Sequence, residues 1–434
     1  MPAQLKFAAA VIWLLLMFSL PVREAGAEEE PTDASRELDL IISQALEQNP
    51  DLRAAEARRR FFAGKIVQAS SLEDPRLSLA LANYPTDSYS WNQTPMTGQI
   101  VKLSQNLPFP GKLAAKANIA EQQANWYREA YREAKIQLIR QVKEAWYALY
   151  LQERTLERTE AGLSLLDDII RLAENLYETG KGAQQDILKA QVERSILFEK
   201  RLTLRQQRDI DLANLNSLRN APTETAITPP HDLAPRLYPY SLEELQEKAA
   251  TLRPLARAYQ SLVDQYKAQQ ELARLNYYPD FAIGAAYTFR QPNPGDSGTD
   301  FASLEFAVNI PLFQEKRRGA SAEAAAGAAM AQHQRDDFLN KTRLSIHDGF
   351  TLMEKNSQLM SLYKSGIIPQ ATQSLAASVS GYQVGKIPFS TLFDNMLTLY
   401  KYEVEYYRTQ VDYARSIARL EADAGLTADP VDRN

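Results

Sequence analysis

The side chains that could carry out catalysis or bind a metal are few and scattered in this sequence. The 434 residues include no cysteine, which excludes disulfides, thiolate zinc sites, cysteine nucleophiles and lipidation of an N-terminal cysteine. The three histidines, His231, His333 and His347, are too far apart in the sequence to form a His-rich metal motif. No Walker A, HExxH, GxSxG or dinucleotide-binding motif occurs in a supporting strand-turn-helix context. The residue content therefore predicts no enzyme, no cofactor and no metal site.

Charge and paired carboxylates also give no sign of a substrate. The adjacent aspartates Asp167-Asp168 and Asp336-Asp337 lie in stretches predicted to be helical. Neighbouring residues diverge around a helix, so the two members of a pair cannot act on one substrate atom. The formal net charge is −5, and no block of Lys or Arg is present. We therefore expect no nucleic acid partner, because neutralising phosphates needs a basic face.

The N-terminus predicts export from the cytoplasm. An apolar run of 14 residues, Phe7 to Leu20, follows Lys6 and precedes the small residues Ala25-Gly26-Ala27. This is the pattern of a secretory signal peptide cleaved before Glu28. The run is shorter than the ~20 residues of a membrane-spanning helix. We predict that residues 1–27 are a signal peptide and that the mature chain has no transmembrane helix. The alternative is an uncleaved anchor.

Four landmark segments occur twice, at offsets of 203 to 205 residues. They are ALEQNPDLRA and AATLRPLARA around Pro50 and Pro254, EDPRLSLAL and YYPDFAIGA at Pro75 and Pro279, QNLPFPGK and VNIPLFQEK at Pro108 and Pro311, and LYETGKGAQQDIL and GYQVGKIPFSTLF at Gly180 and Gly385. A proline-rich stretch, 219–240, separates the two sets and cannot continue a helix. The pattern predicts two tandem structural repeats, residues 28–229 and 230–434.

Each repeat is predicted to contain a very long helix, a glycine turn and a second long helix. The 68 residues from Lys112 to Thr179 contain no proline and would form a helix of about 100 Å. Their apolar residues follow two adjacent seams, for example Leu163, Leu166 and Ile170 beside Leu165, Ile169 and Leu172. A two-stranded coiled coil needs only one seam. Two seams indicate the staves of a helical barrel; the alternative is a wide core face in a globular bundle.

Four segments alternate between apolar and small or polar residues, which predicts strands at about 76–84, 97–106, 280–289 and 301–310. Leu77, Leu79 and Leu81 share one face of the first strand, and the same period suits a membrane β-barrel with a wet interior. Four strands cannot close a barrel, and an open edge is not viable in lipid. Several chains must then share one barrel, and the alternation does not choose between two and three. The alternative is a soluble sheet covered by the helices.

The chain resembles the TolC family of outer-membrane efflux proteins over residues 38–426. The segments that carry the resemblance are NPDLRA from Asn49, QNLPFPGK from Gln105, IPLF from Ile310, the turns YETGK from Tyr177 and YQVGK from Tyr382, and LEADAGL from Leu420. No one motif is highly specific, but their duplicated order behind a signal peptide is.

The resemblance implies an α+β membrane protein that is a homotrimer. A 12-stranded transmembrane β-barrel, with four strands from each chain, would lie in the cell outer membrane, and a long α-helical barrel would cross the periplasm. It implies a passive channel-tunnel that exports small molecules or ions and is gated at its periplasmic helical tips. The implied partners are outer-membrane lipid, a periplasmic adaptor (membrane fusion protein) and an inner-membrane pump. PFPGK resembles the branch paired with resistance-nodulation-division pumps. The alternative is a periplasmic coiled-coil adaptor or scaffold without a membrane barrel.

The resemblance also places the gate. The acidic residues that constrict family members fall at Asp394 and Thr391 in the second repeat and at Asp186 in the first. Thr391 departs from the usual aspartate. Three copies of Asp394 around one axis would form a ring that favours cations. The alternative is that Asp186 and Asp394 only favour helix N-termini, where the macrodipole is positive.

The tip turns carry the remaining candidates. Gly180 and Gly385 permit the left-handed backbone of a tight helix-turn-helix tip. Lys181 and Lys386 follow them and are candidates for docking the adaptor; the alternative is that they are solvated turn residues.

Overall fold

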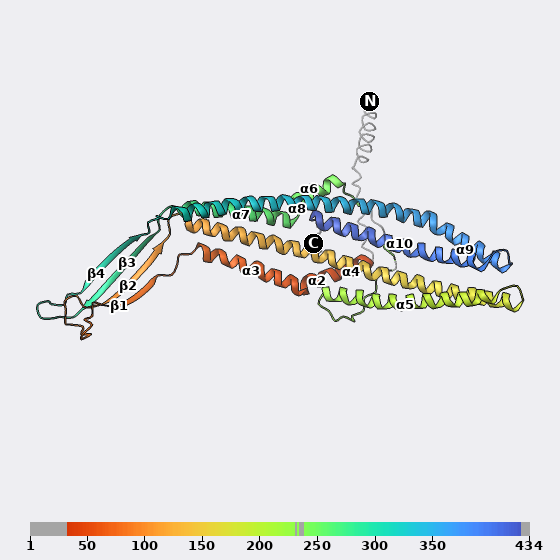
Figure 1. Ribbon diagram of the computed structural model, residues 1–434, viewed down its shortest axis with the longest axis horizontal. Helices are drawn as coiled ribbons and strands as arrows, with labels where there is room; N and C mark the ends of the chain where they lie inside the picture. Colours follow the sequence, from red (N-terminus) through yellow and green to blue (C-terminus); the bar gives the residue numbers. More distant parts are fainter. Residues whose placement is uncertain (1–32, 231, 234–237, 427–434) are drawn as a thin grey trace, which may run out of the picture.

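A computed structural model describes residues 33–230, 232–233 and 238–426. The predicted signal peptide lies outside these residues. The molecule is a long rod, with a small sheet at one end and helices that run from it to the opposite end (Figure 1). Two helical hairpins form that far end, and the sheet therefore lies at the greatest distance from the predicted gate residues.

The elements follow one order twice along the chain. The first set is α2 (Asp33–Gln48), α3 (Pro50–Ser70), β1 (Arg76–Ala82), β2 (Gly98–Leu107), α4 (Lys112–Glu178) and α5 (Gln184–Leu218). The second set is α6 (Leu242–Leu252), α7 (Pro254–Leu275), β3 (Phe281–Arg290), β4 (Phe301–Val308), α8 (Gln314–Leu362), a π-helical turn (Tyr363–Ile367), α9 (Ile368–Gln383) and α10 (Phe389–Ala424).

The duplicated prolines mark helix starts. Pro50 lies in the first turn of α3, where Asn49 caps the helix by accepting the N–H of Leu52 at 3.0 Å. Pro254 lies in the first turn of α7. Proline is favoured there because its fixed φ suits the helix and its missing N–H has no partner to lose. Both prolines thus separate a short helix from the longer helix that leads to the sheet.

The very long helix is continuous in the first half of the chain and interrupted in the second. α4 runs unbroken for 67 residues. Its counterpart consists of the 49-residue α8, the π-helical turn and α9. Pro369 lies in the first turn of α9. Because proline has no N–H to donate to the preceding turn, the helix widens locally instead of continuing in regular α geometry.

The long helices form a layer in which α5, α4, α10 and the α8–α9 segment are neighbours in that order. α4 therefore has helices on both sides, α5 and α10 toward the tips and α3 and α7 toward the sheet, as its two apolar seams require. Leu166, which is fully buried, packs in the cluster shared by α4, α5, α9 and α10. The two edges of the layer remain apolar and exposed. On α5 the exposed residues are Leu188, Val192, Ile196, Phe198, Leu202 and Ile210; on α8 they are Met330, Leu344, Leu352 and Leu362.

The sheet is antiparallel in the order β1-β2-β3-β4. Its register aligns one apolar face: Leu79 pairs with Val101, Val101 with Tyr287, and Tyr287 with Ala302. The other face carries mostly small and polar residues, with Ser78, Lys102, Ala286 and Ser303 in one row. The apolar face is exposed in the single chain, with 79% of Leu304 and 80% of Phe306 accessible.

Candidate gate at the helical tips

Two glycine turns close the two hairpins at the end of the rod farthest from the sheet (Figure 1). Gly180 follows α4 with φ +68°, and Gly385 follows α9 with φ +70°. Residues that carry a side chain rarely adopt this left-handed backbone conformation, so glycine suits both positions. The N–H of Lys181 bonds to the carbonyl of Leu176 at 2.8 Å. Lys386 makes the matching bond, to Gly381 at 2.9 Å.

The helices that leave the two turns also begin alike. The N–H of Asp186 donates to the carbonyl of Ala183 at 3.1 Å, and the N–H of Thr391 donates to Pro388 at 3.2 Å. Asp186 and Thr391 thus occupy equivalent positions in the two hairpins. Asp394, which lies three residues beyond Thr391, is exposed.

Asp186 is joined to the other hairpin by a side chain that the sequence did not single out. The hydroxyl of Tyr382, in the last turn of α9, donates to Oδ2 of Asp186 at 3.1 Å. Tyr382 is 5% exposed. Burial, together with the hydrogen bond to Asp186, raises the pKa of the Tyr382 hydroxyl, so it stays protonated as the donor. We call the Tyr382–Asp186 pair the latch.

Aromatic packing holds Tyr382 in place. Its ring lies 5.8 Å from that of Phe389, and Phe389 stacks on Phe393 at 6.1 Å. The ammonium of Lys189, on α5, lies 5.9 Å from the centroid of the Phe393 ring. This contact provides a second link between the hairpins. Lys189 follows Asp186 by the same three residues that separate Asp394 from Thr391, so a basic residue stands in the first hairpin where the second has an acid.

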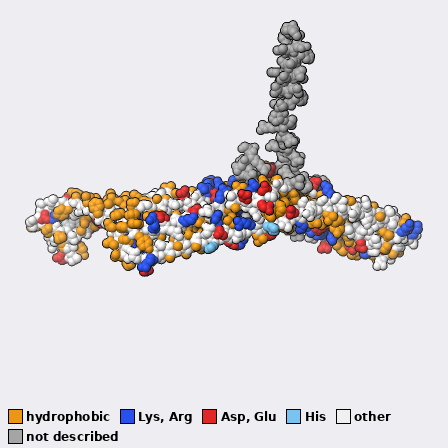
Figure 2. Space-filling view, turned by 90° about the horizontal axis from the view of Figure 1, so that it is seen from above, with side chains coloured by type: hydrophobic (Ala, Val, Ile, Leu, Met, Phe, Trp, Pro, Cys, Tyr) orange, Lys and Arg blue, Asp and Glu red, His pale blue; other side chains and the backbone are white. Residues whose placement is uncertain are grey.

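The structure thus divides the residues predicted for the tip into three groups. It places Asp186 in the latch, whereas Thr391 and Asp394 are exposed on α10. Gly180 and Gly385 form the turns, and Lys181 and Lys386 are exposed beside them. Figure 2 shows basic side chains at this end of the rod. The signal for Tyr382 was available in the sequence, because a tyrosine starts both YETGK and YQVGK.

The described ranges, 33–230, 232–233 and 238–426, contain no group of His, Cys, Asp and Glu side chains arranged to hold a metal ion. None of the helices within these ranges has an apolar stretch long enough to cross a membrane.

Comparison with known proteins finds a family match in the first half of the chain. Residues 41–221 match the sequence profile of the family described as Outer membrane efflux protein. This match spans less than half of the chain.

Solved structures share the fold of this chain along most of its length. VceC from Vibrio cholerae is 19% identical, with a TM-score of 0.77 over 91% of this chain and 99% of that chain. The outer-membrane channel OprN is 18% identical, with a TM-score of 0.74 over 91% of each chain. CmeC from Campylobacter jejuni is 14% identical, with a TM-score of 0.73 over 90% of this chain and 85% of that chain. No curated protein sequence matches the chain.

Proposed function

We propose that this protein is an outer-membrane efflux channel, a homotrimer whose three chains share one 12-stranded barrel in the outer membrane and one helical tunnel in the periplasm. The tunnel receives small molecules or ions from the periplasm or from an inner-membrane pump and releases them outside the cell. It is a passive duct, and its gate is at the helical tips.

The distribution of charge on the sheet carries this proposal. Within the four strands, the charged residues are Arg76, Lys102, Arg290 and Glu305, and the register places all four on the face with the small and polar residues. The opposite face presents Leu, Phe, Val and Ile side chains that are exposed in the single chain. One apolar wall and one polar wall are what a barrel in lipid with a wet bore requires.

The edges of the chain support assembly from several copies. Among residues 33–230, 232–233 and 238–426, no strand pairs with the outer edge of β1 or of β4, and unpaired backbone groups are not tolerated in lipid. The exposed apolar residues of α5 and α8 lie at the two edges of the helical layer in the same way. Copies joined edge to edge would complete both the sheet and the layer. Eight strands would also close a barrel, so the number three rests on the family resemblance.

The proposed gate of the trimer lies at the helical tips. The latch holds the two hairpins of one chain together, and three exposed Asp394 side chains would converge near the axis as a cation-favouring ring. Thr391 narrows the tip without adding charge. Release of the latch would let the hairpins separate and widen the entrance.

The position of the tips also indicates where the proposed partners would bind. Lys181 and Lys386 are exposed at the tips, where a periplasmic adaptor would dock. The PFPGK segment favours a resistance-nodulation-division pump behind that adaptor. We further infer that residues 1–27 direct export and are removed, that the absence of cysteine leaves the mature chain without a lipid anchor, and that 28–229 and 230–434 are two tandem repeats.

Planar lipid bilayers test this function. Protein extracted from the outer membrane with detergent should form pores that conduct ions. The single-channel conductance should be small while the tips are closed. A preparation that stays in the soluble periplasmic fraction, or that adds no conductance even when the latch is removed, would overturn the proposal.

A further inference from the structure

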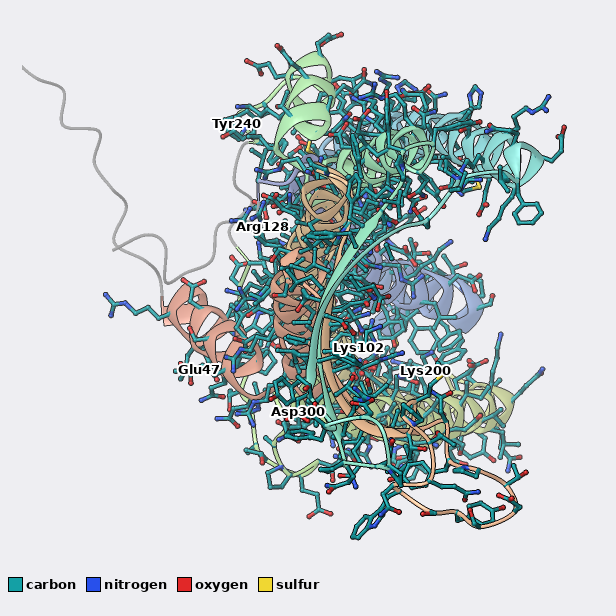
Figure 3. The ribbon with its side chains drawn as sticks, turned by 90° about the vertical axis from the view of Figure 1, so that its left-hand side faces the viewer. Glu47, Lys102, Arg128, Lys200, Tyr240 and Asp300 are labelled. Carbon is teal, nitrogen blue, oxygen red and sulfur yellow. The ribbon has the colours of Figure 1, made fainter. Side chains whose placement is uncertain are left out.

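An ion pair crosses the middle of the polar face of the sheet. Lys102 lies on β2 and Glu305 on β4, and Nζ of the lysine contacts Oε2 of the glutamate over the intervening strand β3. Both side chains are accessible, at 32% and 56%. Figure 3 looks along the molecule from the sheet end and labels Lys102 on this sheet.

The intervening strand is shaped to let the two side chains meet. Adjacent strands are about 4.8 Å apart, so the pair spans two such intervals. In register, β3 contributes Ala286 opposite Lys102 and Gly284 opposite Glu305. A Cβ atom added at Gly284 would lie 3.4 Å from Cε of Lys102. Larger residues at these two positions would block the path of the lysine stem.

The other two charges on this face lie at strand ends. Arg76 is the first residue of β1, and Arg290 is the last residue of β3. Arg290 is already engaged: its Nε donates to the carbonyl of Pro95 at 2.9 Å, and it forms an ion pair with Asp296. Lys102 and Glu305 are therefore the charges in the middle of the wall.

We propose that Lys102 and Glu305 set the charge selectivity of the barrel bore. As a pair they keep the bore neutral, because the positive charge of the lysine cancels the negative charge of the glutamate. Three copies place three such pairs around the wall at one level. The bore then passes solutes of either sign, and selection by charge is left to the tips. This inference rests on the barrel of the proposed function. If either partner is lost, three uncompensated charges of one sign line a water-filled bore, where their field extends for about 8 Å at physiological salt.

The absence of native cysteine allows a direct test. Ser303→Cys introduces a thiol on the polar face, two residues from Glu305 and in the row of Lys102. Outer membranes carrying this variant are treated with a cationic and with an anionic methanethiosulfonate, and the ratio of the two reaction rates is measured. With the pair intact, the ratio should equal that of a small free thiol.

Each partner is then removed in the Ser303→Cys background. Glu305→Gln should shift the ratio about tenfold toward the anionic reagent, and Lys102→Met about tenfold toward the cationic reagent, as expected for one unpaired charge a few ångströms away in water. The charge-reversed double variant Lys102→Glu/Glu305→Lys should restore the original ratio.

A control on the other face separates this inference from the proposed function. Leu304→Cys points to the apolar face and should react with neither reagent. If Ser303→Cys reacts but its ratio is the same in all charge variants, the inference is wrong and the barrel stands. If Leu304→Cys reacts and Ser303→Cys does not, the faces are reversed and the proposed function fails with the inference.

Discussion

Tyr382 and Asp186 join the two hairpins of one chain at the tip of the rod, through a hydrogen bond of 3.1 Å between a buried phenol and a carboxylate. The two residues lie 196 positions apart in the sequence. A hydrogen bond to a charged group contributes about 1.5–3 kcal/mol. The proposed trimer would contain three such bonds at its entrance.

Removal of the latch hydroxyl should open the tip. Tyr382→Phe keeps the ring that packs on Phe389 but deletes the donor to Asp186. We expect a larger single-channel conductance in planar bilayers. Tyr177→Phe is the matched control, because Tyr177 holds the equivalent place in the first hairpin and is 47% exposed. It should leave the conductance unchanged. Equal conductance in the wild type and in Tyr382→Phe would show that the latch does not hold the gate.

Asp394 should set the preference of the closed tip for cations. Asp394→Asn removes three converging negative charges in the trimer, so the ratio of K⁺ to Cl⁻ permeability, obtained from reversal potentials in a salt gradient, should fall severalfold. Glu178→Gln removes an exposed acid at the end of α4 and is the control. If the two variants lower the ratio equally, the charge of the tip as a whole, rather than a ring of Asp394, sets the preference.

A buried arginine should be essential for the stability of the rod. Arg253 lies between α6 and α7 and is 8% exposed. It pairs with Glu133 of α4 at 3.1 Å and with Asp423 of α10 at 3.0 Å. Arg253→Met leaves buried carboxylates without their cation, which costs about 3–5 kcal/mol of unfolding free energy.

Denaturant unfolding of the detergent-solubilised protein measures this loss. The control is Arg274→Ala, which breaks the exposed pair with Glu271 and should cost far less, because water screens exposed ion pairs. Similar losses in the two variants would contradict a special role for Arg253.

Glu403 should make stability depend on pH. Burial raises the pKa of this carboxyl above 4.5, and the Arg158 guanidinium, 3.9 Å away, opposes the shift only in part. An acid with a raised native pKa binds its proton more tightly in the folded state. Its contribution to stability is therefore present at pH 4 and is lost as the pH rises through the native pKa.

Glu403→Gln, which is neutral at every pH, should therefore have a higher Tm than the wild type at pH 8 and an equal Tm at pH 4. Glu271 provides the opposite case, because the hydrogen bond from Arg274 lowers the pKa of its carboxyl. Glu271→Gln should give no gain at pH 8. A gain in both variants would point to general relief of negative charge.

Local patterns in the sequence predict much of the fold. The alternation through Leu77, Leu79 and Leu81 marks a strand because a period of two is a property of neighbouring residues. The four strands end within two residues of the ranges that the alternation predicts. Pro50 and Pro254 mark helix starts for an equally local reason.

Local patterns could not predict the contacts between segments that lie far apart in the sequence. The pairing of β2 with β3 sets the register that brings Lys102 to Glu305, 203 residues away. The latch likewise depends on how α9 packs beside α5. The apolar periodicity does not predict the π-helical turn at Tyr363–Ile367, because the widening there depends on the missing N–H of Pro369.

The mass of the purified protein in detergent tests the central claim most directly. Light scattering that separates the protein from the bound detergent should give three times the mass of one mature chain, as the proposed homotrimer requires. A monodisperse single chain that remains folded and soluble without detergent would contradict the account.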